Sequence, residues 1–270
     1  MLENKVFALR FATVERKLSD TFLGWQEKDG PIDLDFYFWV IKTESKIILV
    51  DTGFSENASK KRKRQYIHTP SEALQNLGIS PMDVTDVIIT HLHFDHAGNT
   101  DLFPNASFYL QEEEMAFATG KLMNHKELNH HIDIEDVTKV LELVYAGRVL
   151  FVNGDYEIAP GITIHLIAGH TPGIQSVRIE TQRGPVIIAS DSIHYYANYN
   201  NKMPFPGMAD YAGKLEGYRK IRALTDHNDL IIPSHDPLVR HRYPKTNDQT
   251  DIVSLHLPPS SSYPLEREEQ

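Results

Sequence analysis

The chain has 270 residues, and 27 Lys plus Arg stand against 37 Asp plus Glu, a formal net charge of -10. Nucleic-acid binding needs a basic surface, so this balance argues against a nucleic-acid partner. Cysteine is absent, which excludes disulfides, a thiolate nucleophile, iron–sulfur clusters and cysteine-ligated zinc. The 14 histidines and many carboxylates leave room for a metal site with nitrogen and oxygen ligands, which suit hydrolytic chemistry.

The composition, with 41% apolar and 24% charged residues, is typical of a globular protein with one sizeable core. We expect a single domain over residues 1–270, with a disordered tail from about residue 258, where Pro, Ser and Glu are frequent. The first residues lack the apolar stretch of a signal peptide, and the densest apolar run, 36–41, is too short to span a bilayer. A cytoplasmic protein with no membrane partner is therefore expected, with a homodimer as one expected assembly.

In chain order, the first third of the sequence predicts strands and one short helix. Apolar and β-branched patterns predict strands at 6–17, 33–42 and 46–50, the last two as a hairpin. A basic run at 60–64 is interpreted as a solvated face rather than a nucleic-acid patch, because the chain is acidic. A helix capped by Ser71 is expected over 71–77, followed by a compact buried strand at 84–90.

The rest of the chain adds further strands and helices. Strands are predicted at 106–110, 149–153, 156–158, 162–167 and 230–232, helices at 111–118 and 212–224, and a second hairpin at 176–180 and 185–189. The segment 124–142 is polar and partly helical, and we interpret its His125, His130 and His131 as surface residues. Both hairpins deliver an aspartate after a β-branched strand, in IILVDTG and VIIASDS, which suggests two similar halves that feed one site.

The strongest chemical signal is the segment THLHFDHAG at 90–98, which follows a predicted buried strand. In an extended segment His91 and His93 point the same way, so both can hold one metal ion. A turn then lets Asp95 and His96 hold a second ion. Gly98 permits a close approach of the backbone or a positive φ.

Three more candidate ligands share one setting, in which an apolar strand is followed by a ligand type and a turn residue. They are His170 in AGHTPG, Asp191 in ASDS and His235 in PSHD. In layered α/β folds, functional sites form at strand ends. We therefore expect these three side chains to complete the metal site.

This ligand series resembles the metallo-β-lactamase superfamily, and within it the N-acyl homoserine lactonase-like group, over roughly residues 34 to 240. The resemblance implies an α/β fold, the four-layer αββα sandwich, with two divalent metal ions, usually zinc, although iron, cobalt or manganese also occur. It assigns the metal ligands as follows: His91, His93 and His170 on one ion, Asp95, His96 and His235 on the other, and Asp191 bridging. Asp51 then matches the aspartate that orients a ligand histidine.

Features of the chain favour a lactonase or related ester hydrolase within that superfamily. The commonest β-lactamases of this fold place a cysteine where Asp191 stands, and this chain has none. Glyoxalase II enzymes carry a C-terminal helical domain, for which the 35 residues after His235 leave little room. RNase Z-like enzymes need a basic surface, and flavodiiron proteins replace the histidine that is intact here as His93.

The expected reaction opens the ring of a small-molecule lactone, of the N-acyl homoserine lactone type. Asp95 is the candidate to pass a proton to the leaving oxygen. Lactonases of this group carry a substrate-contacting tyrosine three residues after the bridging aspartate. Here His194 holds that position and Tyr195 and Tyr196 follow, so all three are candidates to contact the substrate. The residues Phe22, Leu23, Trp25 and 203–208 are candidates for the pocket wall.

Three alternatives share these residues. One is hydrolysis of another ester, a thioester or a phosphodiester on the same scaffold. Another is a sulfur dioxygenase, which has the same HxHxDH motif but a single iron ion. The last is a metal-bound scaffold without turnover, which the complete set of ligands disfavours.

Overall fold

The computed structural model describes residues 4–246 and 251–260, so most of the predicted disordered tail lies outside the described residues. One β-sheet consists of β1 (Lys5–Lys17), β2 (Pro31–Lys42), β3 (Ile47–Val50), β4 (Gln65–Tyr66), β5 (Asp86–Ile88), β6 (Ser107–Gln111), β7 (Val149–Val152) and β13 (Ile252–Ser254). Its strand order is β13-β1-β2-β3-β5-β6-β7, and β4 pairs with β1. From β3 to β7 neighbouring strands are parallel.

The second sheet has the order β12-β11-β10-β9-β8. Its strands are β8 (Tyr156–Ala159), β9 (Ile162–Leu166), β10 (Gln175–Thr181), β11 (Gly184–Ser190) and β12 (Ile231–Pro233). Both predicted hairpins are present, because β2 pairs antiparallel with β3 and β10 pairs antiparallel with β11. Strands β11 and β12 are parallel, so both carry their following residues to the same edge of the sheet.

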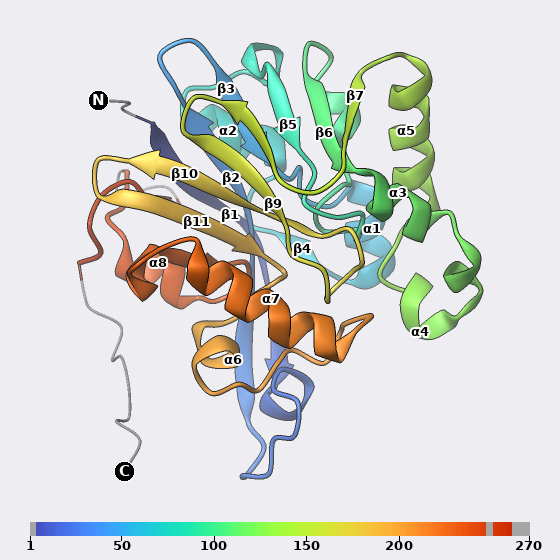
Figure 1. Cartoon of the computed structure of the whole chain (residues 1–270), viewed down its shortest axis with the longest axis vertical. Helices are drawn as coiled ribbons and strands as arrows, with labels where there is room; N and C mark the ends of the chain where they lie inside the picture. The colour runs from blue at the N-terminus through green and yellow to red at the C-terminus, as the bar shows by residue number, and fades with distance from the viewer. Residues whose placement is uncertain (1–3, 247–250, 261–270) are drawn as a thin grey trace.

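The structure has helices on the outer face of each sheet and others beyond the sheets (Figure 1). They are α1 (Glu56–Arg62), α2 (Pro70–Asn76), α3 (Glu112–Ala118), α4 (Lys126–Asn129), α5 (Ile134–Tyr145), α6 (Tyr196–Asn200), α7 (Tyr211–Ala223) and α8 (Leu238–Arg242). Apolar residues of α1, α2 and α5 pack on the first sheet, and those of α7 pack on the second.

The two sheets and the helices outside them form four layers, and a buried apolar cluster fills each of the three spaces between neighbouring layers. Successive side chains of a strand point to opposite faces and so contribute to different clusters. In β2, Phe38 faces the helices on the first sheet, whereas its neighbour Trp39 faces the second sheet. In β11, Ile188 joins Trp39 between the sheets, and Ile187 packs outward with Ile221 of α7. The predicted four-layer αββα sandwich is therefore confirmed.

Two of the local differences from the sequence prediction have a clear physical reason. The helix expected over 71–77 is α2, and its cap is Thr69 rather than Ser71. Thr69 and Glu72 form a reciprocal capping box, and Pro70 fits the first turn because no intrahelical bond needs its nitrogen. The strand predicted at 84–90 is shorter, because the chain leaves the sheet after Ile88 to form the loop that carries the motif histidines.

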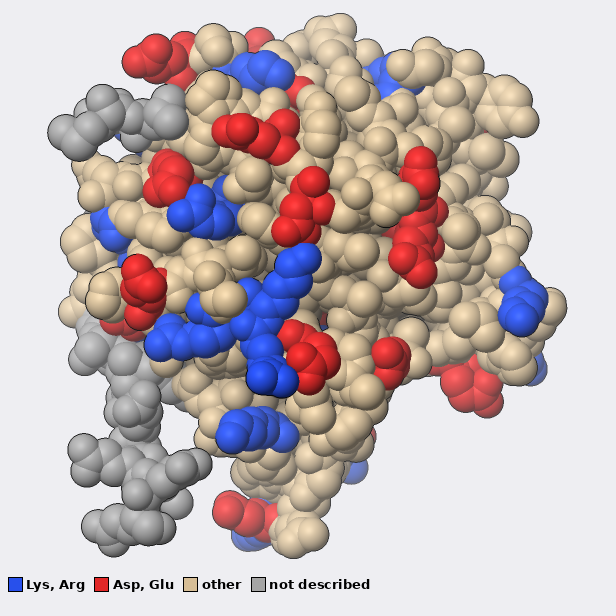
Figure 2. Space-filling view, viewed as in Figure 1, with Lys and Arg blue, Asp and Glu red and all other residues tan. Residues whose placement is uncertain are grey.

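The surface over α7 mixes charges of both signs. Figure 2 shows Lys and Arg side chains gathered there with Asp and Glu beside them. Lys220 pairs with Asp155 at 2.8 Å, and Arg219 pairs with Glu216 at 3.3 Å. Within the described ranges, the helices are all too short or too polar to cross a membrane.

Asp136 in the first turn of α5 makes the stability of the fold depend on pH. Burial and the nearby Asp133 raise the pKa of Asp136 to about 7. Because this value exceeds the unfolded value of about 4, the folded chain binds more protons between those pH values, and the free energy of unfolding falls as pH rises through them. Asp136→Asn should remove this loss and raise the free energy of unfolding at pH 8 by about 2–4 kcal/mol.

Urea denaturation at pH 5 and pH 8 measures the effect of Asp136→Asn. The matched control is Glu135→Gln, which makes the same charge change at an exposed position of the same helix. An unchanged pH dependence in Asp136→Asn would show that Asp136 does not cause the loss.

Candidate metal centre

The candidate ligands lie where strands of both sheets end. Asp51 follows β3, the motif histidines follow β5, and Asp191 and His235 follow β11 and β12. The two similar halves predicted from the sequence also share a backbone feature. Asp51 has a φ of 64°, and Ser190, directly before Asp191, has a φ of 49°. Residues with side chains seldom adopt this left-handed conformation, which here turns each strand sharply toward the shared site.

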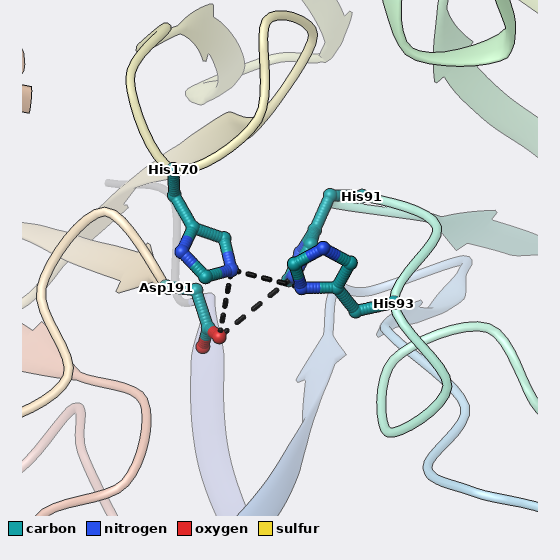
Figure 3. Close-up of side chains that lie close together, drawn as sticks. All are labelled: His91, His93, His170 and Asp191. Atoms are coloured by element: carbon teal, nitrogen blue, oxygen red, sulfur yellow. Dashed lines mark hydrogen bonds and ion pairs between the residues drawn. The ribbon is translucent and has the colours of Figure 1, made fainter. Parts of the chain in front are cut away.

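Four buried side chains converge in the first ligand group (Figure 3). His170 Nε2 lies 3.0 Å from His93 Nδ1 and 3.2 Å from Asp191 Oδ2. His91 Nε2 lies 3.8 Å from the same aspartate oxygen. One ligand atom from each of the four lies within 4.8 Å of the others, so the group can enclose one cation.

A second buried group combines Asp95, His96 and His235. Nε2 of His235 and Nε2 of His96 lie 3.0 Å and 3.3 Å from Asp191 Oδ1, and each lies 3.7 Å from Asp95 Oδ2. Asp191 therefore presents Oδ2 to the first group and Oδ1 to the second, which is the arrangement a bridging carboxylate requires.

Hydrogen bonds fix which nitrogen of three ligand histidines is free. His170 Nδ1 donates to the Gly207 carbonyl at 2.6 Å, and His235 Nδ1 donates to the Asp35 carbonyl at 2.8 Å. A carbonyl only accepts, so the proton is on Nδ1 and the lone pair is on Nε2. His96 Nδ1 is held in the same way by the Asp51 carboxylate at 2.7 Å. All three rings thus direct Nε2 lone pairs to the site.

The site atoms fit two divalent cations. Among the described residues, His91 Nε2, His96 Nε2 and Asp191 Oδ1 are buried without a hydrogen-bond partner. Buried polar atoms are nearly always paired, so such a group of bare acceptors fits the chemistry of a cation site. Burial also lowers the pKa of His91 and His93 well below the usual range, which favours the neutral imidazole that binds metal.

Asp51 lies behind the ligands, as the sequence predicted, and orients more than one element. Besides His96, it accepts a hydrogen bond from the Thr90 amide at 2.7 Å and from the Thr90 hydroxyl at 2.8 Å. The Thr90 hydroxyl also lies 2.7 Å from the Ser190 hydroxyl. This buried network joins the end of β3 to the residues that precede His91 and Asp191.

Of the two roles considered for Gly98, close backbone approach is the one the structure has. A Cβ at this position would lie 2.5 Å from the Ser55 nitrogen and 2.7 Å from the Phe54 Cα. The φ of Gly98 is not positive. A side chain is therefore excluded because the motif loop packs directly on the segment after Asp51.

The three candidates for substrate contact have different positions. His194 Nε2 lies 3.2 Å from Asp191 Oδ2, so His194 faces the site. The Tyr195 hydroxyl instead donates to a backbone carbonyl of β2 at 2.9 Å. Tyr196 packs in the apolar layer between the sheets. Neither tyrosine lines the two cavities beside the ligands, so of the three candidates the structure brings only His194 to the site.

Two adjoining cavities, of about 380 and 250 Å³, open beside the ligands. Phe205 and Gly207 line both, which agrees with the predicted wall at 203–208, whereas Phe22, Leu23 and Trp25 line neither. His130 and His131 also line both cavities; His130 is exposed, as predicted, whereas His131 is partly buried, and neither joins a ligand group among the described residues. The His131 ring lies 5.0 Å from that of His93, and burial lowers the pKa of His131 to about 3.

Glu114 is a buried residue of the site that the sequence did not reveal. Its carboxylate accepts hydrogen bonds from the Leu92 amide at 2.9 Å, the Thr171 hydroxyl at 2.6 Å and the Gly173 amide at 3.2 Å. It therefore joins the motif loop to the loop of His170. Burial raises the pKa of Glu114 to about 7. It lies in a run of three glutamates, and nothing in the sequence distinguishes it from its neighbours.

Lys214 of α7 is the second residue that the sequence did not reveal. Its amine is buried and donates to the backbone carbonyl of Asp191. Burial lowers the pKa of Lys214 to about 7. The contact holds the backbone of Asp191 in place.

Comparisons with known proteins agree with this geometry. The family model of the metallo-beta-lactamase superfamily matches residues 37–249. An N-acyl homoserine lactonase from a Bacillus species is 32% identical over 196 residues, which covers 65% of this chain and 71% of that protein. The N-acyl homoserine lactonase AiiA of Bacillus thuringiensis subsp. kurstaki is 31% identical over 192 residues, with the same coverage.

Solved structures have the same fold. A quorum-quenching N-acyl homoserine lactone lactonase superposes with a TM-score of 0.74 at 25% identity, over 88% of this chain and 94% of that one. AidC, a dizinc quorum-quenching lactonase, superposes with a TM-score of 0.72 at 21% identity, over 97% of both chains. The resemblance predicted from the ligand series is confirmed.

Replacing Glu114 should weaken the link between the two ligand loops. In Glu114→Gln an amide NH₂ replaces one oxygen, so Gln cannot accept the hydrogen bonds of both Leu92 and Gly173. We expect the free energy of unfolding to fall by about 2 kcal/mol and metal to be retained less tightly. Denaturant unfolding and metal content after dialysis against a chelator measure both effects.

The control for Glu114→Gln is Glu113→Gln, an exposed neighbour on the same helix. Equal stability and equal metal retention in the two variants would refute the positioning role of Glu114.

Proposed function

Because this chain belongs to the metallo-β-lactamase superfamily, we propose that it is a dinuclear metal-dependent lactonase that opens the ring of an N-acyl homoserine lactone-like substrate. The observation that carries the proposal is the position of Asp191, whose two oxygens each face a separate buried group of nitrogen and oxygen ligands. The lactonase names of its relatives supply the substrate class.

We propose zinc as the resident metal, since imidazole and carboxylate ligands suit it, although iron, cobalt and manganese also bind such sets. One ion is assigned to His91, His93 and His170, the other to Asp95, His96 and His235, and Asp191 is assigned to both. When bound, such ions lower the pKa of a water molecule and polarise the substrate carbonyl.

The protein's own groups position the substrate and move a proton. Asp95 lines the smaller cavity and is the proposed donor of a proton to the leaving oxygen. His194 lines the same cavity, and its Nδ1 is buried without a hydrogen-bond partner among the described residues. We assign His194 the contact with the carbonyl oxygen that the tyrosine supplies in the related group.

Two ligand groups that share one aspartate support hydrolysis over a sulfur dioxygenase and over a metal-bound scaffold without turnover. A sulfur dioxygenase needs a single iron, and a decayed scaffold loses ligands, whereas all seven predicted ligands come together here. A quorum-quenching role would follow from hydrolysis of N-acyl homoserine lactones. The cytoplasmic location and the homodimer stay predictions from the sequence.

Replacing the shared aspartate tests the proposal directly. Asp191→Asn removes the negative charge that both ligand groups share, so metal content should fall below about two ions per chain and lactone hydrolysis should fall at least about a hundredfold. Elemental analysis gives the metal content, and acid release in a pH-stat gives the rate on several lactones, with and without a chelator.

The control for Asp191→Asn is Asp226→Asn, which makes the same charge change at an exposed position. Full metal content together with the full rate in Asp191→Asn would contradict the bridging assignment, and acid release that persists after chelation would contradict the metal-dependent reaction.

A further inference from the structure

The basic run that the sequence predicted to be a solvated face turns partly toward the cavities. Arg62 at the end of α1 and Arg64, two residues later, both line the smaller cavity, beside the ligands Asp95 and Asp191. Arg16, near the far end of β1, lines both cavities. A chain with a net charge of -10 therefore places three guanidinium groups around one substrate space.

Arg62 is already neutralised within the protein. Its guanidinium bonds the buried Asp133 carboxylate at 3.2 Å and lies over the Phe94 ring, 4.0 Å from the ring centre. Lys61 also binds Asp133. Arg62 thus lines the cavity wall, and its positive charge is already paired with Asp133.

Arg16 and Arg64 have no acidic partner within 4.0 Å among the residues that the structure describes. Their hydrogen bonds go to backbone carbonyls, from Arg16 to Asp20 and from Arg64 to Arg62. The Nε atoms of both side chains are buried without a partner. The cavity wall therefore holds two guanidinium groups that lack a paired carboxylate and have Nε donors to spare, and Asp20 and Glu127 also line the larger cavity.

Both guanidinium groups line the same cavity as Asp95 and His194. The Arg16 guanidinium lies 5.1 Å from the centre of the Phe205 ring, which stacks on the His194 ring at 4.0 Å. Burial and the positive charge of Arg16 lower the pKa of Arg64, while Asp95 opposes this. Two like charges that are partly buried next to each other raise the free energy of the empty cavity, and a bound anion relieves this cost.

We propose, on the basis of the proposed lactonase function, that Arg16 and Arg64 form an oxyanion-binding subsite, so that the preferred substrate is a lactone whose acyl part carries a carboxylate or a phosphate. The planar guanidinium group matches both oxyanions through paired N–H donors. The ligand groups hold the ring, and the subsite holds the charged end. A neutral acyl chain leaves both guanidinium groups unpaired.

The experiment compares homoserine lactones of equal tail length that end in a carboxylate, a phosphate or an uncharged carboxamide, with the metal-loaded enzyme. The carboxylate or the phosphate substrate should have a kcat/KM at least about tenfold above that of the carboxamide, because charge-assisted hydrogen bonds are stronger than neutral ones. Which of the two is higher identifies the oxyanion. Added NaCl should reduce this preference.

Arg16→Met and Arg64→Met should each lower the preference for the charged over the carboxamide substrate about tenfold. The matched control is Lys17→Met, which removes the same charge from an exposed side chain on the same strand. A preference that is absent in the wild type, or that survives in both arginine variants, would overturn the subsite.

Binding separates this inference from the lactonase proposal. The corresponding lactams, which resist hydrolysis, are titrated into the enzyme by calorimetry. Tighter binding of a charged lactam that is lost in Arg16→Met and Arg64→Met supports the subsite even when no lactone is hydrolysed, in which case the reaction alone is wrong. Equal binding of charged and uncharged lactams overturns the subsite even when both lactones are hydrolysed.

Discussion

The carboxylate of Asp191 sets the constraint on which the site depends. Five imidazole Nε2 atoms, from His91, His96, His170, His194 and His235, lie 3.0–3.8 Å from its two oxygens. So many buried nitrogen and oxygen acceptors around one carboxylate fit cations that lie between them. The hydrogen bonds behind the imidazoles, the left-handed strand ends and the buried amine of Lys214 all serve to hold this cluster in place.

Much of this architecture can be predicted from the sequence, because strand patterns and ligand spacing are local signals. The β-branched runs before Asp51 and Asp191 predicted strands that end at ligands, and the pattern of His91 and His93 predicted a shared metal. The cap of α2 was assigned to Ser71, because a Ser before an apolar run satisfies the same rule as Thr69. Only the reciprocal bond between Thr69 and Glu72 distinguishes the two.

Sequence patterns do not identify residues whose role depends on partners far away along the chain. Glu114 acts on Leu92 and Thr171, which lie 22 and 57 positions away along the chain. His131 was interpreted as a surface residue because no strand ends beside it, yet a loop brings its ring against His93. Arg64 belongs to a run that reads as a charged helix face, and its direction is set by the pairing of β4 with β1. Tertiary packing, which no local pattern encodes, decides all three.

The long hairpin of β1 and β2 holds part of the cavity wall apart from the candidate metal ligands. Arg16 stands near its far end, opposite Ile32, whereas the ligands rise from strand ends in the core of the sandwich. A point change at the hairpin end reshapes the cavity wall without touching the bonds that orient any imidazole. The shape of this wall and the geometry of the ligand cluster can therefore change independently of each other.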